Sequence, residues 1–482
     1  MLKESKNTDE LKRSLNLFPT TMIVIGSVVG SGIFVSSAAM ARSLGSAGWM
    51  LAVWAIAGML TLFGAFTQCE LASQMPRTGG LYEYLKIIYG ETTGYIYGWA
   101  NFMIAGSGAI AAIAYIFASY MGEFTNLPHL SVEQEKWPLH IPLIGTLYPL
   151  ADFGTKIVGS LLIAFLTLLN VRGIKVGATL QSISTSAKIL AIAIVIGAAF
   201  IFGSEVGSFE NLGGVNPLGA SLSGWGLIGA ISVAMSGAFW SYDGWGNVAY
   251  IAGEVREPSR TLPRAIILGT FTFIALYLFI NVAYLYILPI DALGKVADDR
   301  VASAMVSMIL GSPGAMIVAL LILLSTFDTT NSSILTNSRV YYAMAMDSLF
   351  WKKAAKIHPK YNTPHVALWC QAAWAIVLLM SGSFDSIMSM YVFVNWALYV
   401  LMALGLFILR KRNPDTTRPF SVPGYPWVPA IFTLFSFLYV CVTLINDVSA
   451  YQAGEQPLIK SLAGIALILM GLPFYFIWRK KY

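Results

Sequence analysis

Charged residues are scarce in this chain of 482 residues: they make up 11% of it, whereas hydrophobic residues make up 57%. Because a soluble domain carries about 25% charged residues, a soluble chain of this length would lack the polar surface that its several domains need. The shortage excludes a soluble enzyme and a disordered chain. It predicts a membrane protein with many spanning segments.

Cysteine and histidine are also rare, with three and four residues respectively. The cysteines (Cys69, Cys370 and Cys441) all lie in apolar runs, so the sequence predicts no disulfide framework. It contains no H-E-x-x-H, C-x-x-C or Walker-type motif. We therefore expect no enzymatic activity, no metal site and no cofactor.

Twelve apolar runs, here called spans 1 to 12, come near the length of about 20 residues that a membrane helix needs. They begin near Leu17, Ala47, Gly94, Asp152, Ser182, Gly224, Ala265, Met308, Val366, Ser386, Trp427 and Ile459. With the N-terminus in the cytoplasm, 24 of the 30 Lys and Arg residues fall on the cytoplasmic side, as the positive-inside rule requires. The net charge of +6 is therefore attributed to orientation in a membrane and not to nucleic acid binding.

The span count gives a domain organisation. We predict a cytoplasmic N-terminal tail (1–15), a first five-helix repeat (16–203), an extracellular loop with a second five-helix repeat (204–408), and spans 11 and 12 with a short cytoplasmic C-terminus (409–482). The polar first 15 residues lack the pattern of a cleaved signal peptide. We expect a multi-pass protein of the plasma (inner) membrane with both termini in the cytoplasm.

Glycine and polar residues interrupt two of the spans near their middles. The interruptions lie at 26–32 in span 1 and at 234–247 in span 6. Interruptions at matching places in two halves of a chain are typical of transporters with inverted repeats. The alternative interpretation is a packing face, because Gly26 and Gly30 also have the G-x-x-x-G spacing of closely packed membrane helices.

A broken helix suits a zwitterion. Backbone N–H groups are exposed where the second half-helix begins, and carbonyls where the first one ends. The amides near Ser31 and Gly32 are candidates to bind a carboxylate, and the carbonyls near Val28 and within 240–243 to bind an ammonium. Since an unpaired charge away from water costs several kcal/mol, such a site would select the headgroup of an α-amino acid.

Three segments carry a family resemblance. Residues 26–34 read G-S-V-V-G-S-G-I-F, residues 75–84 read M-P-R-T-G-G-L-Y-E-Y, and 240–264 contain W-S-Y-D-G-W and E-V-R-E-P-S-R-T-L-P-R. With these motifs the chain resembles the amino acid–polyamine–organocation (APC) superfamily, and within it the L-type amino acid transporter-like permeases. The resemblance covers about residues 15–480.

The resemblance implies an all-α polytopic membrane protein that works by alternating access. Its twelve transmembrane helices would form a 5+5 inverted repeat, with discontinuous helices 1 and 6, plus two additional helices. The resemblance assigns the substrate headgroup to Val28, Gly30, Ser31 and Gly32. It makes Trp240 the gating aromatic residue and places Ser241 and Asp243 beside the substrate ammonium. Tyr277 resembles a family residue near the central cavity, for which a packed membrane tyrosine is the alternative interpretation.

Lys188 and Asp328 are ionisable residues within spans, where such residues are costly and mark functional sites by default. Lys188 resembles the family's buried lysine, which implies a place beside the break in span 1, where sodium-coupled relatives hold sodium. A fixed ammonium would make sodium unnecessary there, and it could also exchange a proton; snorkelling to the cytoplasm is the alternative. Asp328 would pair with Lys188 or with the hydroxyls of Ser325, Thr326 and Thr329. The alternative is an aspartate that distorts its helix or contacts water.

The sequence thus predicts a sodium-independent secondary transporter of L-α-amino acids, with neutral ones favoured, that works by exchange or is proton-linked. The alternatives are a carrier of cationic amino acids or polyamines, which Asp243 could favour, and a sensor that binds an amino acid without transport. We expect an L-amino acid and membrane lipid as partners, and no nucleic acid. The loop between spans 3 and 4 lacks the cysteine of animal relatives, so no disulfide-linked heavy chain is expected.

Overall fold

Helices account for most of the computed structural model, which describes residues 13–30, 32–141 and 145–481. Within these residues, ten helices are long and apolar enough to cross a membrane. Two further helices, α11 (Gly224–Tyr242, 19 residues) and the shorter α16 (His365–Ser381, 17 residues), correspond to the predicted spans 6 and 9. The chain is therefore an all-α polytopic membrane protein, as predicted.

The remaining spans are formed by single helices or by consecutive helices. They are α1 (Leu17–Val28) with α2 (Gly32–Leu44), α3 (Ala47–Gln74), α5 (Glu91–Ala100) with the π-helix η1 (Asn101–Ala105) and α6 (Gly106–Met121), α8 (Phe153–Val171), α9 (Ile174–Phe202), α12 (Pro258–Ile287), α15 (Ser312–Met346), α17 (Phe384–Arg412), α18 (Trp427–Gln452), and α19 (Lys460–Leu469) with α20 (Gly471–Lys481).

Short elements connect the spans. They are α4 (Leu81–Tyr89), α7 (Val132–Glu135), α10 (Pro217–Ser221), α13 (Ile290–Gly294), α14 (Val301–Leu310), the 3-10 helices η2 (Phe209–Gly213), η3 (Asn247–Glu254), η4 (Ala297–Asp299) and η5 (Lys352–Ala355), and the antiparallel strands β1 (Leu139–Ile141) and β2 (Gly145–Leu147). The small sheet lies in the loop between spans 3 and 4, for which no strand was predicted.

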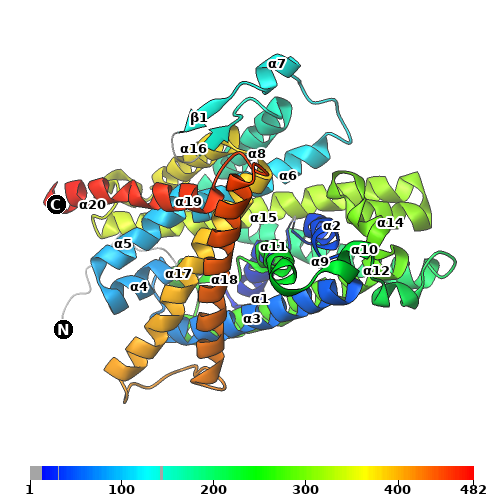
Figure 1. Cartoon of the computed structure of the whole chain (residues 1–482). Coiled ribbons are helices and arrows are strands. Elements are labelled where there is room, and N and C mark those ends of the chain that lie inside the picture. Colours follow the sequence, from blue (N-terminus) through cyan, green and yellow to red (C-terminus); the bar gives the residue numbers. More distant parts are fainter. Residues whose placement is uncertain (1–12, 31, 142–144, 482) are drawn as a thin grey trace, which may run out of the picture.

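The connections lie on two opposite faces of the helix bundle. In Figure 1, α4 and the segment that joins α17 to α18 lie at the left and lower left, whereas α7, α10 and α14 lie at the top and right. Chain order gives the same division, because α4 follows span 2 and the other three helices follow odd-numbered spans. We call these the α4 face and the α7 face.

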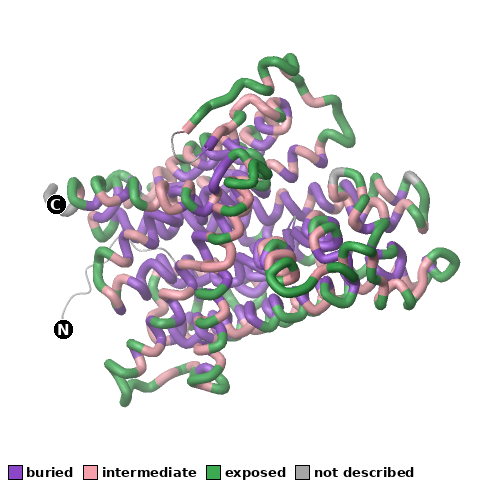
Figure 2. Tube along the Cα trace, in the orientation of Figure 1, coloured by how far each residue is buried: buried purple, intermediate pink, exposed green. Residues whose placement is uncertain are grey.

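Burial is concentrated in the middle of the bundle, and exposed residues cover the loops and the outer sides of the helices (Figure 2). Span 1 is the most buried of the long spans, whereas α18 and α19–α20 are the least buried. Large apolar side chains such as Leu434 and Ile445 of α18 are exposed. Because a spanning helix meets lipid on its outer side, this apolar exposure is expected of a membrane protein.

Three span boundaries differ from their predicted positions by more than three residues. Span 5 begins at Ile174 and not near Ser182. Span 7 begins at Pro258, because α12 starts with that proline at its first position, where the missing N–H is no loss. Span 8 begins at Ser312, and the predicted start near Met308 lies in the separate helix α14. Gly311, with φ of +70°, ends α14 and turns the chain into α15.

Buried ion pairs join the helices near the α4 face. Arg339 of α15 donates to Glu254 of η3 over 2.9 Å, and both side chains are at most 1% exposed. Arg410 of α17 donates to both carboxylate oxygens of Glu70 of α3 at 2.7 and 2.5 Å. The N-terminal segment is attached here too, because the Leu15 amide donates to the Glu254 carbonyl at 3.0 Å. These contacts close the α4 face of the bundle.

Removal of one member of a buried pair should destabilise the fold strongly. We expect Arg339→Met to lower the free energy of unfolding by about 3–5 kcal/mol, because Glu254 would be left buried and uncompensated. Thermal unfolding of the purified protein in detergent would measure the change. Arg42→Met is the matched control, since the Arg42–Asp299 pair is partly exposed and should contribute about 0–1 kcal/mol. Equal losses in the two variants would contradict the assignment.

Candidate substrate-binding site

Span 1 is broken at the place that the sequence predicts. Helix α1 ends at Val28 and α2 begins at Gly32, with Val29 in a non-helical conformation between them. Ser31, one of the predicted headgroup residues, lies outside the described residues. The amides of the first turn of α2 therefore face the carbonyls at the end of α1 without the hydrogen bonds of a continuous helix.

Span 6 is broken just after the predicted residues Trp240 and Ser241. Both are still helical, because α11 ends at Tyr242; the turn 243–246 and then η3 follow. Gly244 has φ of +104°, and a Cβ atom there would lie 2.7 Å from the carbonyl oxygen of Ser27. Only glycine satisfies both constraints, so Gly244 lets the two breaks touch.

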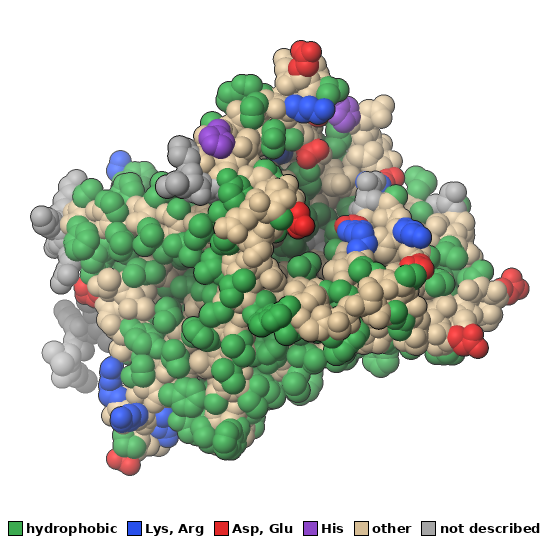
Figure 3. Space-filling view, in the orientation of Figure 1, with side chains coloured by type: hydrophobic (Ala, Val, Ile, Leu, Met, Phe, Trp, Pro, Cys, Tyr) green, Lys and Arg blue, Asp and Glu red, His purple; other side chains and the backbone are tan. Residues whose placement is uncertain are grey.

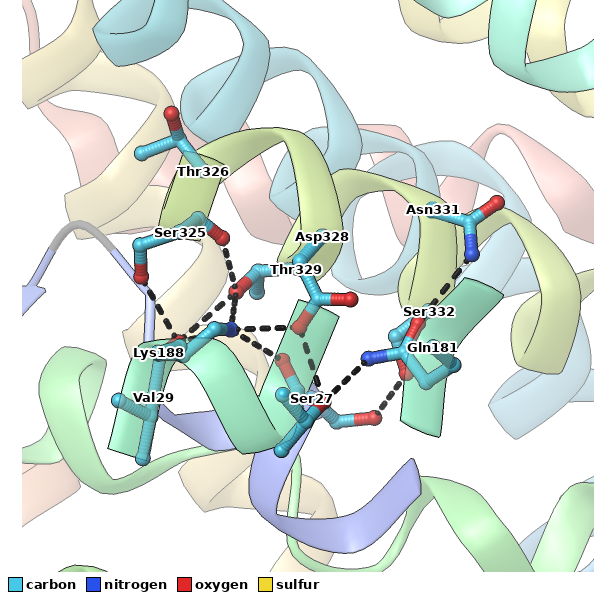
Figure 4. Close-up of polar contacts among 12 residues, drawn as sticks. Ser27, Val29, Gln181, Lys188, Ser325, Thr326, Asp328, Thr329, Asn331 and Ser332 are labelled. Atoms are coloured by element: carbon cyan, nitrogen blue, oxygen red, sulfur yellow. Dashed lines mark hydrogen bonds and ion pairs between the residues drawn. The ribbon is translucent and has the colours of Figure 1, made fainter. Parts of the chain in front are cut away.

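The first break leaves carbonyls without an intrahelical partner, and other groups of the protein donate hydrogen bonds to them (Figure 4). The Val29 carbonyl accepts hydrogen bonds from Lys188 Nζ at 2.5 Å, from Thr329 Oγ1 at 3.1 Å and from Ser325 Oγ at 3.2 Å. The Val28 carbonyl accepts one from Tyr277 Oη at 3.0 Å. These donors occupy the first of the two sets of carbonyls that the sequence assigned to a substrate ammonium. The assignment of the second set, within 240–243, stays a prediction.

Lys188 and Asp328 form an ion pair deep in the bundle. Lys188 Nζ lies 2.8 Å from Asp328 Oδ2, and both side chains are at most 1% exposed. Thr185 Oγ1 also donates to this carboxylate oxygen, over 3.0 Å. Thr326 points away from the pair in Figure 4 and donates to the Ile322 carbonyl instead. Such burial does not fit a lysine that snorkels to the membrane surface.

Asp243 is held by two residues of α17 that the sequence did not single out. Asn395 Nδ2 donates to Asp243 Oδ2 and Tyr399 Oη donates to Asp243 Oδ1, each over 2.6 Å. A signal was available, because Tyr391, Asn395 and Tyr399 recur every four residues in an apolar span and so lie on one face of the helix. That face lies against the break in span 6.

The two breaks enclose a small cavity of about 30 Å³. Among the predicted residues, its lining includes Val28, Gly30, Gly32, Trp240 and Asp243. Since one water-sized sphere needs roughly 10–15 Å³ of such volume, the cavity is too small for an amino acid as it stands. A neighbouring side chain has to move before a substrate can fit.

Aromatic side chains separate this cavity from a larger hollow. The Trp240 ring packs edge-on against Tyr391 and Phe384, with ring centres 5.2 and 5.9 Å apart. Beyond them lies a hollow of about 800 Å³, lined by α2, α11, α17, α18 and the start of α19. Figure 3 shows its mouth between the part of the chain that carries α7 and the part that carries α14, with charged side chains nearby. The hollow thus reaches from the α7 face to Phe384, which packs against Trp240.

The other predicted residues lie around this cavity without lining it. Ser241 Oγ donates to the Gly237 carbonyl and to Ser36, and a Cβ atom on Gly32 would lie 2.6 Å from the Ser241 Cα. Lys188 and Asp328 lie behind the first break. Within the described residues, no group of three His, Cys, Asp or Glu side chains could hold a metal ion.

Comparison with known proteins identifies the family. A family model described as amino acid permease matches residues 15–470. The chain is 30% identical to the serine/threonine exchanger SteT of Bacillus subtilis, over 98% of both chains. It is 28% identical to the b(0,+)-type amino acid transporter 1 of Homo sapiens, over 98% of this chain and 90% of that one. The chain belongs to the amino acid permease family.

A third relative also spans nearly the whole permease. The large neutral amino acids transporter small subunit 2 of Mus musculus is 28% identical over 98% of this chain and 82% of its own. These matches support the resemblance to APC superfamily permeases that the sequence motifs indicated. Since the family consists of transporters, the permease is not expected to catalyse a chemical reaction.

The glycine at the second break should be indispensable. Gly244→Ala would place a Cβ atom against the Ser27 carbonyl in a backbone conformation that costs about 1–3 kcal/mol for other residues. We expect a lower unfolding temperature and the loss of amino acid binding, both measurable on the purified permease. Gly229→Ala in α11 is the control, because no atom lies near its added methyl group; binding that survives Gly244→Ala would contradict the contact between the breaks.

Proposed function

We propose that the permease is a sodium-independent secondary transporter of L-α-amino acids, with neutral ones favoured, that works by alternating access in the plasma (inner) membrane. Its termini and the α4 face lie in the cytoplasm, in agreement with the distribution of Lys and Arg. The single observation that carries the proposal is the cavity between two helix breaks, which is lined by Gly30, Gly32, Trp240 and Asp243.

The cavity offers one group of each sign to an α-amino acid. The exposed amides at the start of α2, from Gly32 onward, receive the carboxylate, because a helix N-terminus carries partial positive charge. The Asp243 carboxylate and the carbonyls at the end of α11 receive the ammonium. Trp240 covers the bound substrate on the α7 side.

Sodium independence follows from the position of Lys188. Besides the Asp328 carboxylate, its ammonium nitrogen lies within 3.4 Å of three uncharged oxygens, from the Gly26 and Val29 carbonyls and the Thr329 hydroxyl. Unwound carbonyls of this kind coordinate sodium in sodium-coupled transporters. Because a second cation a few ångströms from the ammonium would be repelled strongly in a medium of low dielectric constant, Lys188 takes the place of sodium.

The two faces of the permease fit alternating access. The hollow of about 800 Å³ opens on the α7 face, whereas Glu70–Arg410 and Glu254–Arg339 close the α4 face. A transporter that exposes its site to one side at a time needs this asymmetry. The conformation corresponds to the state that receives substrate from outside the cell.

The names of the relatives favour neutral amino acids and exchange. One is called a serine/threonine exchanger and another a transporter of large neutral amino acids. We extend both properties to the permease and keep proton-linked transport as the alternative to exchange. We also propose that no disulfide-linked heavy chain is needed, because the three cysteines lie in α3, α16 and α18 and not in the loop between spans 3 and 4.

A carrier of cationic amino acids is the second candidate, and one observation favours it. Asp243 lines the cavity and forms no ion pair with any described residue. A cationic side chain would supply the missing positive charge. A sensor that binds without transport is the remaining alternative.

Uptake by proteoliposomes tests these possibilities. Radiolabelled L-leucine, L-serine and L-arginine would be supplied with and without sodium, with and without amino acid inside, and at acidic, neutral and alkaline pH. We expect uptake of a neutral amino acid without sodium, accelerated by internal substrate if the permease exchanges. Binding without uptake would identify a sensor, and a requirement for sodium would overturn the proposal.

The Lys188–Asp328 pair should matter for transport as well as for stability. We expect Lys188→Met and Asp328→Asn each to lower the free energy of unfolding by about 3–5 kcal/mol, because each leaves one buried charge uncompensated. The double variant Lys188→Met/Asp328→Asn should recover most of the stability, as thermal unfolding would show.

Uptake by the double variant then separates the two roles of the pair. If Lys188 supports the break in span 1, the stable double variant transports slowly, with an altered pH dependence. Normal uptake by the double variant at every pH tested would limit the pair to a structural role.

A further inference from the structure

Asp243 differs from the other acids buried among the helices. Glu70 is paired with Arg410, Glu254 with Arg339 and Asp328 with Lys188. Asp243 is 9% exposed, and the ion pairs found among the described residues do not include it. Its partners are the neutral amide and hydroxyl donors of α17.

The two donors occupy both oxygens of the carboxylate. Asn395 Nδ2 lies 2.6 Å from Oδ2 and Tyr399 Oη lies 2.6 Å from Oδ1. Asn395 Nδ2 also lies 3.1 Å from Tyr399 Oη, so a hydrogen bond joins the two side chains. The Tyr399 ring packs against Trp245, with ring centres 5.4 Å apart. The two donors are therefore held by each other and by the Trp245 ring, which lies in the turn after α11.

We infer that Asn395 and Tyr399 determine specificity by positioning: they hold both oxygens of Asp243 and thereby favour neutral over cationic amino acids. The inference rests on the proposed function and deepens it. Neither residue needs to touch the substrate side chain for this effect, because each acts through Asp243.

Competition for lone pairs gives the physical reason. Hydrogen bonds to an ionised carboxylate are about twice as strong as neutral ones, and each carboxylate oxygen has two lone pairs. The α-ammonium group of any amino acid can share the remaining capacity of Asp243. A second cation, on the side chain of arginine or lysine, has to displace the donors of α17, so that part of its attraction to Asp243 is lost.

Removal of a donor should shift the preference toward cationic substrates. The test measures inhibition of L-serine uptake by L-arginine and by L-leucine, in proteoliposomes, for wild type, Tyr399→Phe and Asn395→Leu. We expect the ratio of the L-arginine to the L-leucine inhibition constant to fall about tenfold in each variant, since one hydrogen bond to a charged group is typically worth about this factor. A merely structural effect would change both constants together and leave their ratio unaltered.

Tyr439→Phe is the matched control. Tyr439 of α18 also shares a hydrogen bond with α11, between its Oη and Ser236 Oγ at 2.7 Å, but about two helical turns before Asp243. Its removal should leave the ratio of inhibition constants unchanged.

The outcomes are distinct from those that test the proposed function. An unchanged ratio of inhibition constants in a Tyr399→Phe variant that still takes up L-leucine would overturn this inference but not the proposed function. If Tyr399→Phe does not fold, the same ratio measured in Asn395→Leu tests the inference. A wild-type preference for L-arginine over L-leucine would also overturn it. Absence of uptake of all three amino acids by the wild type would refute the proposed function instead.

Discussion

The structure depends on how the carbonyls of a helix broken inside a membrane are satisfied. No water is available in the hydrocarbon core, so each free carbonyl needs a partner from the protein or a ligand. Lys188, Thr329 and Ser325 converge on the Val29 carbonyl, and Tyr277 donates to that of Val28. With these partners, the chain keeps an unwound segment at the depth where a substrate is expected to bind.

The same requirement explains why Asp328 accompanies Lys188. An ammonium group that satisfies backbone carbonyls brings a full charge into the bundle, and this charge must itself be compensated. Asp328 supplies the opposite charge, and Thr185 donates to the same carboxylate oxygen. The broken helix, the lysine and the aspartate thus form one unit from spans 1, 5 and 8.

Much of the fold and part of the site could be predicted from the sequence. Gly30, Gly32, Lys188 and Asp243 stand out because glycine and charge are conspicuous within apolar runs. Gly26 shows where prediction from the sequence ends. A Cβ atom there would collide with Gln181, so close packing explains the glycine at this position. The pattern of glycines alone could not distinguish packing from substrate binding. The contacts of Gly26 thus support the packing interpretation for that residue, whereas substrate binding at Gly30 and Gly32 stays a prediction.

Contacts between distant segments could not be predicted in this way. Glu70 and Arg410 are 340 positions apart, and a charge near the end of a span looks the same whether or not it has a partner. The donors to Asp243 are 152 and 156 positions away, and only their spacing along span 10 marked them. The end of α11 at Tyr242, beyond Trp240, depends on how Gly244 fits against Ser27, which local sequence does not encode.

The small size of the cavity next to Trp240 bears on the leakage of ions across the membrane. A wide channel between the half-helices would let small ions move down their gradients without any transported substrate. Here the cavity of about 30 Å³ has room for little more than a couple of waters, and the Glu254–Arg339 and Glu70–Arg410 ion pairs close the α4 face. A continuous file of water between the two faces therefore requires the half-helices to move apart.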